Sequence, residues 1–547
     1  MSLNVSGTIG IVLFYIAILF VGIWAAIRKK AKAEKNDERE DCKKRIDKSE
    51  DILVAGRSLG LLVSSITMTA TWVGGGYING TSEETYKKGL LAVQAPFCYA
   101  ASLALGGLIF AEKMRAKNYV TMLDPFQEKY GARIGALMYI PLFIGDILWC
   151  ASILAALGAS IGVVLDIDNT LAIIVSACFC VAYTFVGGLY SVAYTDIVQI
   201  FFIFVGLWLS IPFAFTNHAV HSISSTKKHW LGHWETNKTG VWIDNALLLI
   251  FGAIPSQVYF QRVLACKTAK QTKAQSLLAA FACFAMAIPP FLIGALATST
   301  DWSATAYKGH TNSTLPKEDG NRVLPLVLQY LTPPAVAFIG LGAVTAAVMS
   351  SADSAILSSS SMISRNIYKV LFRPQASERE MLLVIRITTC CVGFCATVMA
   401  LNAESIYGLW AFCVELIYVV LFPQLCCVIF MANANSYGAL SGYIVAVFFR
   451  AGGGVTFIGL KPFIHYPWYD KSNGQLFPFK SLAMILSSLT IIIVSSVTKY
   501  LFKSRHISTK WDALGYFQST YETAFEESSV EKEKSNENSH LLADILS

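Results

Sequence analysis

Charged side chains are scarce in this 547-residue sequence, which contains 14% Asp, Glu, Lys and Arg. Soluble domains carry about 25% charged residues, so the composition argues against an ordinary soluble protein. Long apolar runs alternate with short charged loops, and the mean hydropathy is +0.53. A helix needs about 20 apolar residues to cross a bilayer, whereas barrel strands are much shorter. We therefore predict an all-α polytopic membrane protein.

Motifs that would indicate an enzyme or a metalloprotein are also missing. The 13 cysteines form no CxxC pair and fall mostly in apolar runs, and the eight histidines form no HExxH motif. The formal net charge of +7 comes largely from basic residues beside span ends, which is a topology signal. We expect no enzyme, no organic cofactor and no nucleic-acid partner.

Thirteen apolar segments have roughly the length of a transmembrane helix. The first is followed, not preceded, by basic residues and has no cleavage site, so we interpret it as an anchor rather than a signal peptide. The segments lie near 9–27, 59–79, 91–113, 134–162, 171–188, 196–215, 243–262, 276–298, 324–362, 382–401, 406–430, 437–452 and 481–502. The segment at 324–362 is long enough to be a helix plus a broken or surface piece.

Alternate loops are basic, which predicts the orientation. The loops at 28–58, 112–118, 262–274 and 365–380 collect Lys and Arg and are therefore expected in the cytoplasm. The N-terminus then lies outside and the C-terminus inside. Sequons at Asn4, Asn237 and Asn312 fall on the outer side, where N-glycosylation occurs.

Two predicted spans are interrupted by helix-breaking residues. Trp72 is followed by glycines at 74–76, and the seventh span contains Gly252 and Pro255. Broken helices are tolerated in a membrane where the freed backbone groups line a cavity. Many transporters place such breaks at corresponding positions of two inverted repeats, beside the substrate and ions. Close helix packing at glycine is the alternative, and it explains one break better than two in register.

These breaks predict a ten-helix core of two five-helix repeats. The expected domains are a first helix and cytoplasmic loop (1–58), a first repeat (59–215), an extracellular loop (216–242), a second repeat (243–430), two additional helices (431–503) and a disordered tail (504–547). The tail is polar and acidic. Within it Glu537, Leu541 and Leu542 resemble an acidic dileucine signal for an endocytic adaptor.

A cluster of hydroxyl groups with one acid lies in the ninth predicted span. A run from Ala347 includes Ser350, Ser351 and Asp353 and continues to further serines at 358–361. One or two such hydroxyls usually bond to their own helix, but hard cations such as Na⁺ prefer oxygen ligands. Acids inside spans are functional candidates by default. They are Asp146, Asp196, Asp353 and Glu415, of which Asp196 lies near a span end and can instead cap a helix.

The chain resembles the sodium/solute symporter family, and within it the choline transporters. Residues 187–199 (GGLYSVAYTDIVQ) match the family hallmark, and segments 67–81, 119–127 and 259–264 match the choline transporters. The similarity extends from the first span to about residue 502. It implies sodium coupling, chloride dependence and import of choline across the plasma membrane for acetylcholine synthesis, at presynaptic membranes and synaptic vesicles.

The resemblance also assigns residues. It implies a sodium site in which Ser65, Met68 and Ala347 offer backbone carbonyls and Ser350 and Ser351 offer hydroxyls. A quaternary ammonium cannot donate hydrogen bonds, and aromatic faces attract it through cation–π contacts.

The matching substrate positions are Trp72, Tyr99 and Trp149, with Asp353 as an acid of the site. The choline transporters have Trp where this chain has Ser256, so one wall of the cage is missing here. This difference leaves open a symporter of the same fold for another quaternary amine or small organic solute. A channel would need repeated filter elements and a sensor a signalling domain, and neither is found in the sequence.

Overall fold

The computed structural model describes residues 53–165, 167–184, 189–403, 405–455 and 459–518, with isolated positions between 9 and 24. This part of the chain is built from helices, and its extended segments form isolated bridges only. The helices are α3 Leu61–Trp72, α4 Gly75–Lys88, α5 Ala95–Gly106, α6 Glu112–Ala116, α7 Asp124–Leu137, α8 Tyr139–Leu165, α9 Asn169–Thr184, α10 Leu189–Phe215, α11 Lys227–Leu231, α12 Thr239–Gly252, α13 Gln257–Ala265, α14 Ala269–Thr298, α15 Val323–Leu331, α16 Pro334–Met362, α17 Glu378–Leu401, α18 Ile406–Leu416, α19 Phe422–Phe430, α20 Ser436–Gly452 and α21 Phe479–Lys503. Three π-helical segments continue these helices at Gly107–Ala111 (η3), Ile363–Phe372 (η7) and Ile417–Leu421 (η8).

Within the described residues, nine helices are long and apolar enough to cross a membrane, and the bent pair α3/α4 makes ten. Two further predicted spans, α9 and α20, have 16 and 17 residues, slightly short of the about 20 needed to cross upright. The first predicted span, at 9–27, falls almost wholly outside the described residues. The all-α polytopic class is confirmed.

Both predicted breaks are present. α3 and α4 meet at 46° across Val73 and Gly74. α12 and α13 are separated by residues 253–256, which are not helical. A Cβ at Gly252 would lie 2.5 Å from the carbonyl oxygen of Val414, so glycine permits α12 to approach α18 closely at this break.

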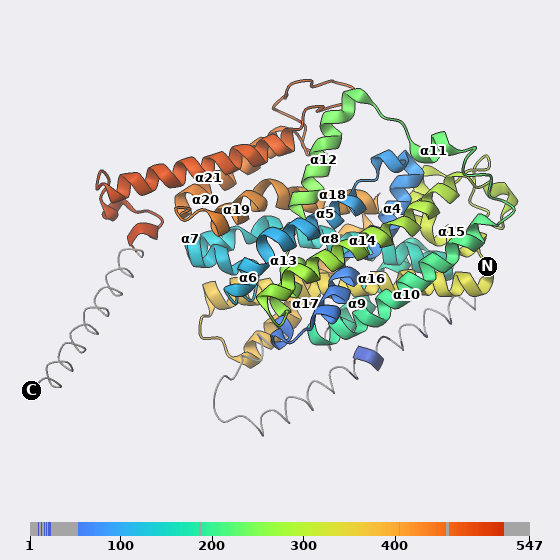
Figure 1. Cartoon of the computed structure of the whole chain (residues 1–547), viewed down its shortest axis with the longest axis horizontal. Helices are drawn as coiled ribbons and strands as arrows, with labels where there is room; N and C mark the ends of the chain where they lie inside the picture. Colours follow the sequence, from blue (N-terminus) through green and yellow to red (C-terminus); the bar gives the residue numbers. More distant parts are fainter. Residues whose placement is uncertain are drawn as a thin grey trace, which may run out of the picture.

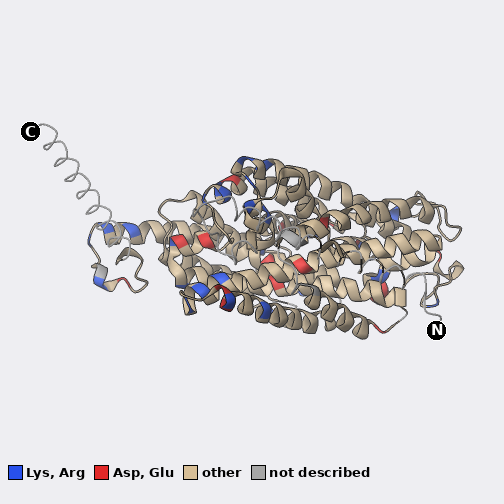
Figure 2. Cartoon of the chain, turned by 90° about the horizontal axis from the view of Figure 1, so that it is seen from below, with Lys and Arg blue, Asp and Glu red and all other residues tan. Residues whose placement is uncertain are grey.

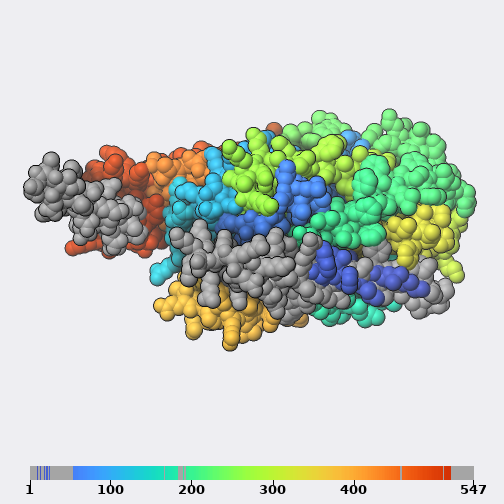
Figure 3. All heavy atoms as spheres, turned by 60° about the horizontal axis from the view of Figure 1, so that its bottom comes forward, coloured from blue at the N-terminus to red at the C-terminus, as the bar shows by residue number. Residues whose placement is uncertain are grey.

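α8 runs through the middle of the bundle. It packs against α4, α9, α16, α17 and α18, and 89% of its most apolar stretch is buried inside the protein, against 28% for α21. The C-terminal helices α20 and α21 pack along one another at one edge (Figure 1). The space-filling view places them at the end of the molecule (Figure 3). Side chains of α8 can therefore face an interior site, and those of α21 face the surroundings.

Four charged residues tie α20 and α21 to the rest of the bundle. Arg450 of α20 pairs with Glu415 of α18, and Lys480 Nζ of α21 lies 2.6 Å from the other Glu415 oxygen. Asp244 of α12 accepts hydrogen bonds from the backbone nitrogens of Lys480, at 3.1 Å, and Ser481, at 2.7 Å. Glu415 thus pairs with both cations, whereas Asp244 is held by the backbone at the start of α21 and by the Ser481 hydroxyl.

The structure differs from the sequence prediction at three element boundaries. Residues 134–137, expected in the fourth predicted span, belong to α7, which ends at Leu137, and α8 begins at Tyr139 after Met138. The segment at 324–362 divides into α15 and α16 at Thr332 and Pro333. Residues 504–518, expected in the disordered tail, are ordered, and the buried Phe517 stacks on Phe502 at a centroid distance of 4.5 Å.

Basic residues are unevenly distributed along the bundle. Figure 2 shows most Lys and Arg in the half that leads to the C-terminus, whereas several acidic residues lie along the middle. Arg262 is an exception to the expected distribution. The sequence placed it in a basic loop, but it belongs to α13 and is fully buried.

Candidate functional site

A small cavity lies where the two broken helices meet α5, α8 and α18. Its volume is about 40 Å³, enough for a few water-sized groups, so the side chains nearly close it. Four of the five predicted substrate residues line it, namely Trp72, Tyr99, Trp149 and Ser256. The remaining lining residues are Thr71, Gly74, Gly76, Tyr77, Asp146, Ile153, Gly252, Ala253, Trp410, Cys413, Val414 and Ile417.

Aromatic rings form much of the cavity wall. Trp72 ends α3 at the first break and lies 6.4 Å from Tyr99 between ring centroids. Tyr99 meets Trp410 edge to face at 4.6 Å, and Trp410 in turn lies 6.0 Å from Tyr77. The sequence prediction missed Trp410 and Tyr77. Tyr77 was within reach, because it follows the glycines of the first break. Trp410 carries no local signal that separates it from other tryptophans in spans.

The acid of the cavity is Asp146, not Asp353. Asp146 lies on α8 one turn before Trp149, is 3% exposed, and its Oδ2 atom has no hydrogen-bond partner among the described residues. An ionisable group in this position is costly in a membrane and points to a function. Asp353 does not line the cavity. It lies on α16 toward α9, where the Cys180 thiol approaches its Oδ1 at 3.8 Å.

The five predicted sodium residues lie on α3 and α16, two helices that pack against each other. Ser65 and Met68 of α3 and Ala347, Ser350 and Ser351 of α16 are all buried. The Ser351 hydroxyl donates to the Thr71 carbonyl at 3.0 Å, a carbonyl that α4 leaves free by starting anew at Gly75. Hydroxyl and carbonyl oxygens are the ligands that a hard cation accepts, so the residues present fit Na⁺.

Asp196 and Arg262 form a buried polar cluster next to these residues. The hydroxyls of Thr67 and Ser350 both donate to the Asp196 carboxylate. Arg262 Nη2 lies 4.0 Å from Asp196 Oδ2, and both side chains are 0% exposed. Arg262 also bonds the Ser354 hydroxyl. Asp196 therefore joins α10 to α3, α13 and α16 rather than only capping a helix end.

Sequence comparison decides the family. The pattern of the sodium:solute symporter family matches residues 52–446. The chain belongs to the sodium:solute symporter family. This symporter is accordingly a membrane transporter coupled to sodium, and it is not an enzyme.

Relatives of this symporter carry a common name. The high-affinity choline transporter 1 of Caenorhabditis elegans is 52% identical over 514 residues, which are 93% of this chain and 88% of that protein. The high affinity choline transporter 1 of Homo sapiens is 51% identical over 524 residues, 94% of this chain and 88% of that protein. A solved Na⁺-coupled sialic acid symporter in a substrate-bound outward-open state matches with a TM-score of 0.71 at 17% identity, over 91% of this chain and 98% of that one. This last likeness supports the fold alone.

Two of the remaining predicted sites of the symporter lie in loops. Asn237 and Asn312 are exposed in the loops before α12 and α15. Asn4 and the tail residues Glu537, Leu541 and Leu542 fall outside the described residues.

A Gly-x-Ser-x-Gly spacing at 158–162, which the sequence prediction overlooked, lies inside the continuous helix α8. Its Ser160 hydroxyl donates to the Ala156 carbonyl at 2.9 Å, so it forms no strand-to-helix nucleophile turn.

Proposed function

We propose that this symporter imports choline together with Na⁺. The observation that carries the proposal is the cavity at the two helix breaks, where aromatic rings surround an acid with an unpartnered oxygen. A desolvated ammonium over an aromatic face gains on the order of 2 kcal/mol. Trp72, Tyr99 and Trp410 supply the faces, and Asp146 supplies the negative charge that balances a permanent cation. The names of the half-identical relatives agree with this substrate.

The proposed substrate residues have different tasks. Trp72, Tyr99 and Trp149 contact the methylated ammonium, as predicted from the sequence. Asp146 takes the role that was predicted for Asp353, because Asp146 is the acid that lines the cavity. Ser256 lines the wall at the second break and leaves it more open than a tryptophan would.

The proposed sodium site lies within reach of the substrate site. Ser65, Met68 and Ala347 contribute carbonyls, and Ser350 and Ser351 contribute hydroxyls. Ser351 already bonds the Thr71 carbonyl, and Thr71 and Trp72 both line the cavity. An ion that draws α16 onto the end of α3 therefore stabilises the residues that hold the substrate. A ligand that binds one conformation more tightly shifts the population toward it, which is how the gradient drives import.

We place the N-terminus outside and the C-terminus in the cytoplasm of the plasma membrane. The gathering of Lys and Arg in the half that leads to the C-terminus supports this orientation (Figure 2). Asn237 and Asn312 are then extracellular glycosylation sites, together with Asn4. The proposal also includes dependence on chloride and a location in presynaptic membranes and synaptic vesicles, where the imported choline supplies acetylcholine synthesis. It further includes binding of an endocytic adaptor through Glu537, Leu541 and Leu542.

A second candidate is a symporter of the same fold for another quaternary amine or small organic solute. Ser256 favours it, because a missing indole leaves room for a larger ligand. If choline is the substrate, replacing Ser256 by tryptophan should make its binding tighter.

Uptake of labelled choline by cells that express the chain tests the assignment. Saturable uptake that disappears when external Na⁺ is replaced supports it, and removal of chloride tests the second ion. Trp72→Ala should abolish uptake at equal surface expression, whereas Ser256→Trp should lower the half-saturating choline concentration. Absence of uptake despite surface expression would refute choline, and a panel of other amines on the same cells would test the second candidate.

A further inference from the structure

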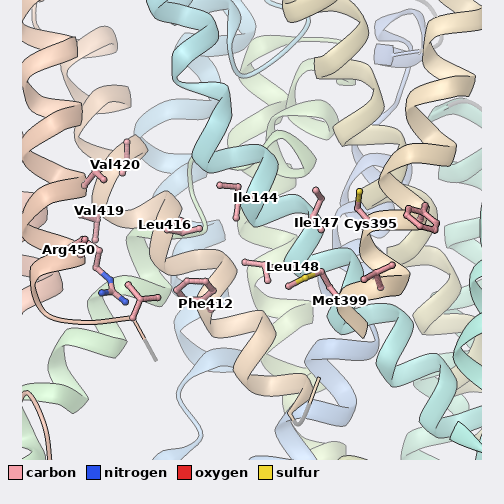
Figure 4. Close-up of a pocket in the computed structure, with 15 residues that line it drawn as sticks. Ile144, Ile147, Leu148, Cys395, Met399, Phe412, Leu416, Val419, Val420 and Arg450 are labelled. Carbon is pink, nitrogen blue, oxygen red and sulfur yellow. The ribbon is translucent and has the colours of Figure 1, made fainter. Parts of the chain in front are cut away.

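An apolar groove opens on the outside of the bundle, next to the proposed substrate cavity. It encloses about 610 Å³ between α8, α17, α20 and the rod formed by α18 and η8. Figure 4 shows Ile144 and Leu148 of α8 facing Phe412 and Leu416 of α18, with Arg450 reaching in from the side. All of the described residues that line the groove, apart from Arg450, are apolar.

The rim of this groove faces the hydrocarbon of the bilayer. Phe394 and Val398 of α17 are 71% and 44% exposed, and Val447 of α20 is 45% exposed. Exposed apolar side chains within membrane-spanning helices lie against lipid tails rather than water. A hollow on such a surface is filled by hydrocarbon, because an empty one forfeits the dispersion contacts of its lining.

The chemistry of the groove selects a chain without a polar group. Arg450 bonds Glu415 through Nε and Nη2, and its Nη1 donates to the Gly454 carbonyl at 2.8 Å. Each guanidinium nitrogen thus has an acceptor within the protein, and the guanidinium charge is balanced by Glu415. A sterol hydroxyl would have to compete for these donors, whereas an acyl chain needs none.

The groove and the cavity share two helices. On α8, Asp146 and Trp149 face the cavity, while the intervening Ile147 and Leu148 face the groove. On the α18–η8 rod, Cys413 and Ile417 line the cavity, while their neighbours Phe412 and Leu416 line the groove. A group that fills the groove therefore rests against the back of two walls of the substrate site.

We propose that this groove is a binding site for one acyl chain of a membrane phospholipid, and that its occupant controls how freely α8 and α18 move during transport. A fluid chain adapts to the changing shape of the groove, because it has many rotatable bonds. A rigid group in its place holds α17 against α8 and α18. The occupant then acts on the rate of the conformational step rather than on substrate contacts.

Photolabelling of the purified protein tests the site. The probe is phosphatidylcholine with a diazirine in the middle of one acyl chain, titrated into detergent solution, and labelled residues are mapped by mass spectrometry. We expect saturable labelling of α8 and α17 residues that line the groove. Val398→Trp should reduce it at least about fivefold by filling the groove. Val497→Trp on α21 is the matched control, because Val497 is an equally exposed apolar residue at 49%, and it should leave the labelling unchanged.

Uptake measurements test whether the occupant of the groove controls the movement of α8 and α18. This test rests on the proposed function, because it uses choline as the substrate. Val398→Trp should lower the maximal rate at least about threefold at equal surface expression without changing the half-saturating choline concentration. Val398→Phe serves if the tryptophan variant does not reach the surface, and Val497→Trp should transport normally. Unsaturable labelling spread over all exposed helix faces, displacement of the probe by cholesterol, or an unchanged rate in a variant that has lost the label would overturn the proposal. Labelling requires no substrate, so it can fail or succeed independently of the choline assignment.

Discussion

Gly74→Ala should weaken sodium binding strongly, although it adds only one methyl group. An ideal Cβ at Gly74 lies 1.8 Å from the Ser351 hydroxyl oxygen and 2.5 Å from its Cβ. The backbone of Gly74, at φ −98° and ψ −170°, is accessible to alanine, so the effect comes from this contact and not from strain. Turning the Ser351 side chain moves its hydroxyl oxygen but not its Cβ, so α16 must also move away from the break, and Ser351 then loses its 3.0 Å bond to the Thr71 carbonyl.

The magnitude follows from two terms. Overpacking in a tight interior costs about 1–3 kcal/mol, and a lost hydrogen bond adds about 1 kcal/mol. Bringing Ser351 back to the ion must reverse both, which amounts to about 2–4 kcal/mol. Since about 1.4 kcal/mol is a factor of ten, the half-maximal sodium concentration should rise by about 30-fold or more.

The assay compares the unfolding temperature of purified protein in NaCl and KCl, and the sodium dependence of uptake. Gly60→Ala is the control, because Gly60 is the N-cap of the preceding helix α3 and a Cβ there meets nothing within 4 Å. Gly60→Ala should keep the stabilisation by sodium, and Gly74→Ala should lose it at moderate salt. Equal sodium dependence in the two variants would refute the placement of Ser351 as a ligand.

Three further predictions concern the buried charges. Asp146→Asn should raise the half-saturating choline concentration at least about tenfold, because it removes the charge that faces the cation; an unchanged concentration dependence would exclude Asp146 from recognition. Glu415→Gln should lower the free energy of unfolding by about 3–5 kcal/mol, because it leaves Arg450 and Lys480 without a carboxylate partner. Thermal unfolding of Glu415→Gln should be compared with that of Arg450→Met, which should be milder if the unpaired cation is the cause. Asp196→Asn should destabilise by a similar amount and weaken stabilisation by sodium, a result that normal thermal behaviour in NaCl would contradict.

Local patterns predicted those features whose cause is local. Glycine and proline weaken a helix locally, and both breaks lie where such residues cluster within a predicted span, although Pro289 and Pro290 are accommodated inside the continuous helix α14. Ala347, Ser350 and Ser351 are spaced i, i+3 and i+4, which puts them on one side of α16 whatever its neighbours are. The aromatic residue at the first break, Trp72, was predictable for the same reason.

Features that depend on how helices are rotated about their axes could not be predicted. Asp146 and Asp353 are both acids inside spans, and nothing local shows that Asp146 faces the cavity and Asp353 faces α9. Arg262 sits at a span end in the sequence, yet α13 buries it beside Asp196 of α10. Phe517 was predicted to belong to a polar tail, but its ring stacks on Phe502.

The charge cluster of α12, α18, α20 and α21 has a consequence for biosynthesis. Asp244 is translated 236 residues before Lys480, and it accepts a hydrogen bond from the backbone nitrogen of Lys480. Until the last helix leaves the ribosome, Asp244 and Glu415 lack part of their partners. Uncompensated carboxylates are costly in hydrocarbon, so the nascent core must keep these groups in contact with water until α21 inserts. A chain that ends before α21 would expose this defect to the quality control of the membrane, and the final helix thereby completes the assembly.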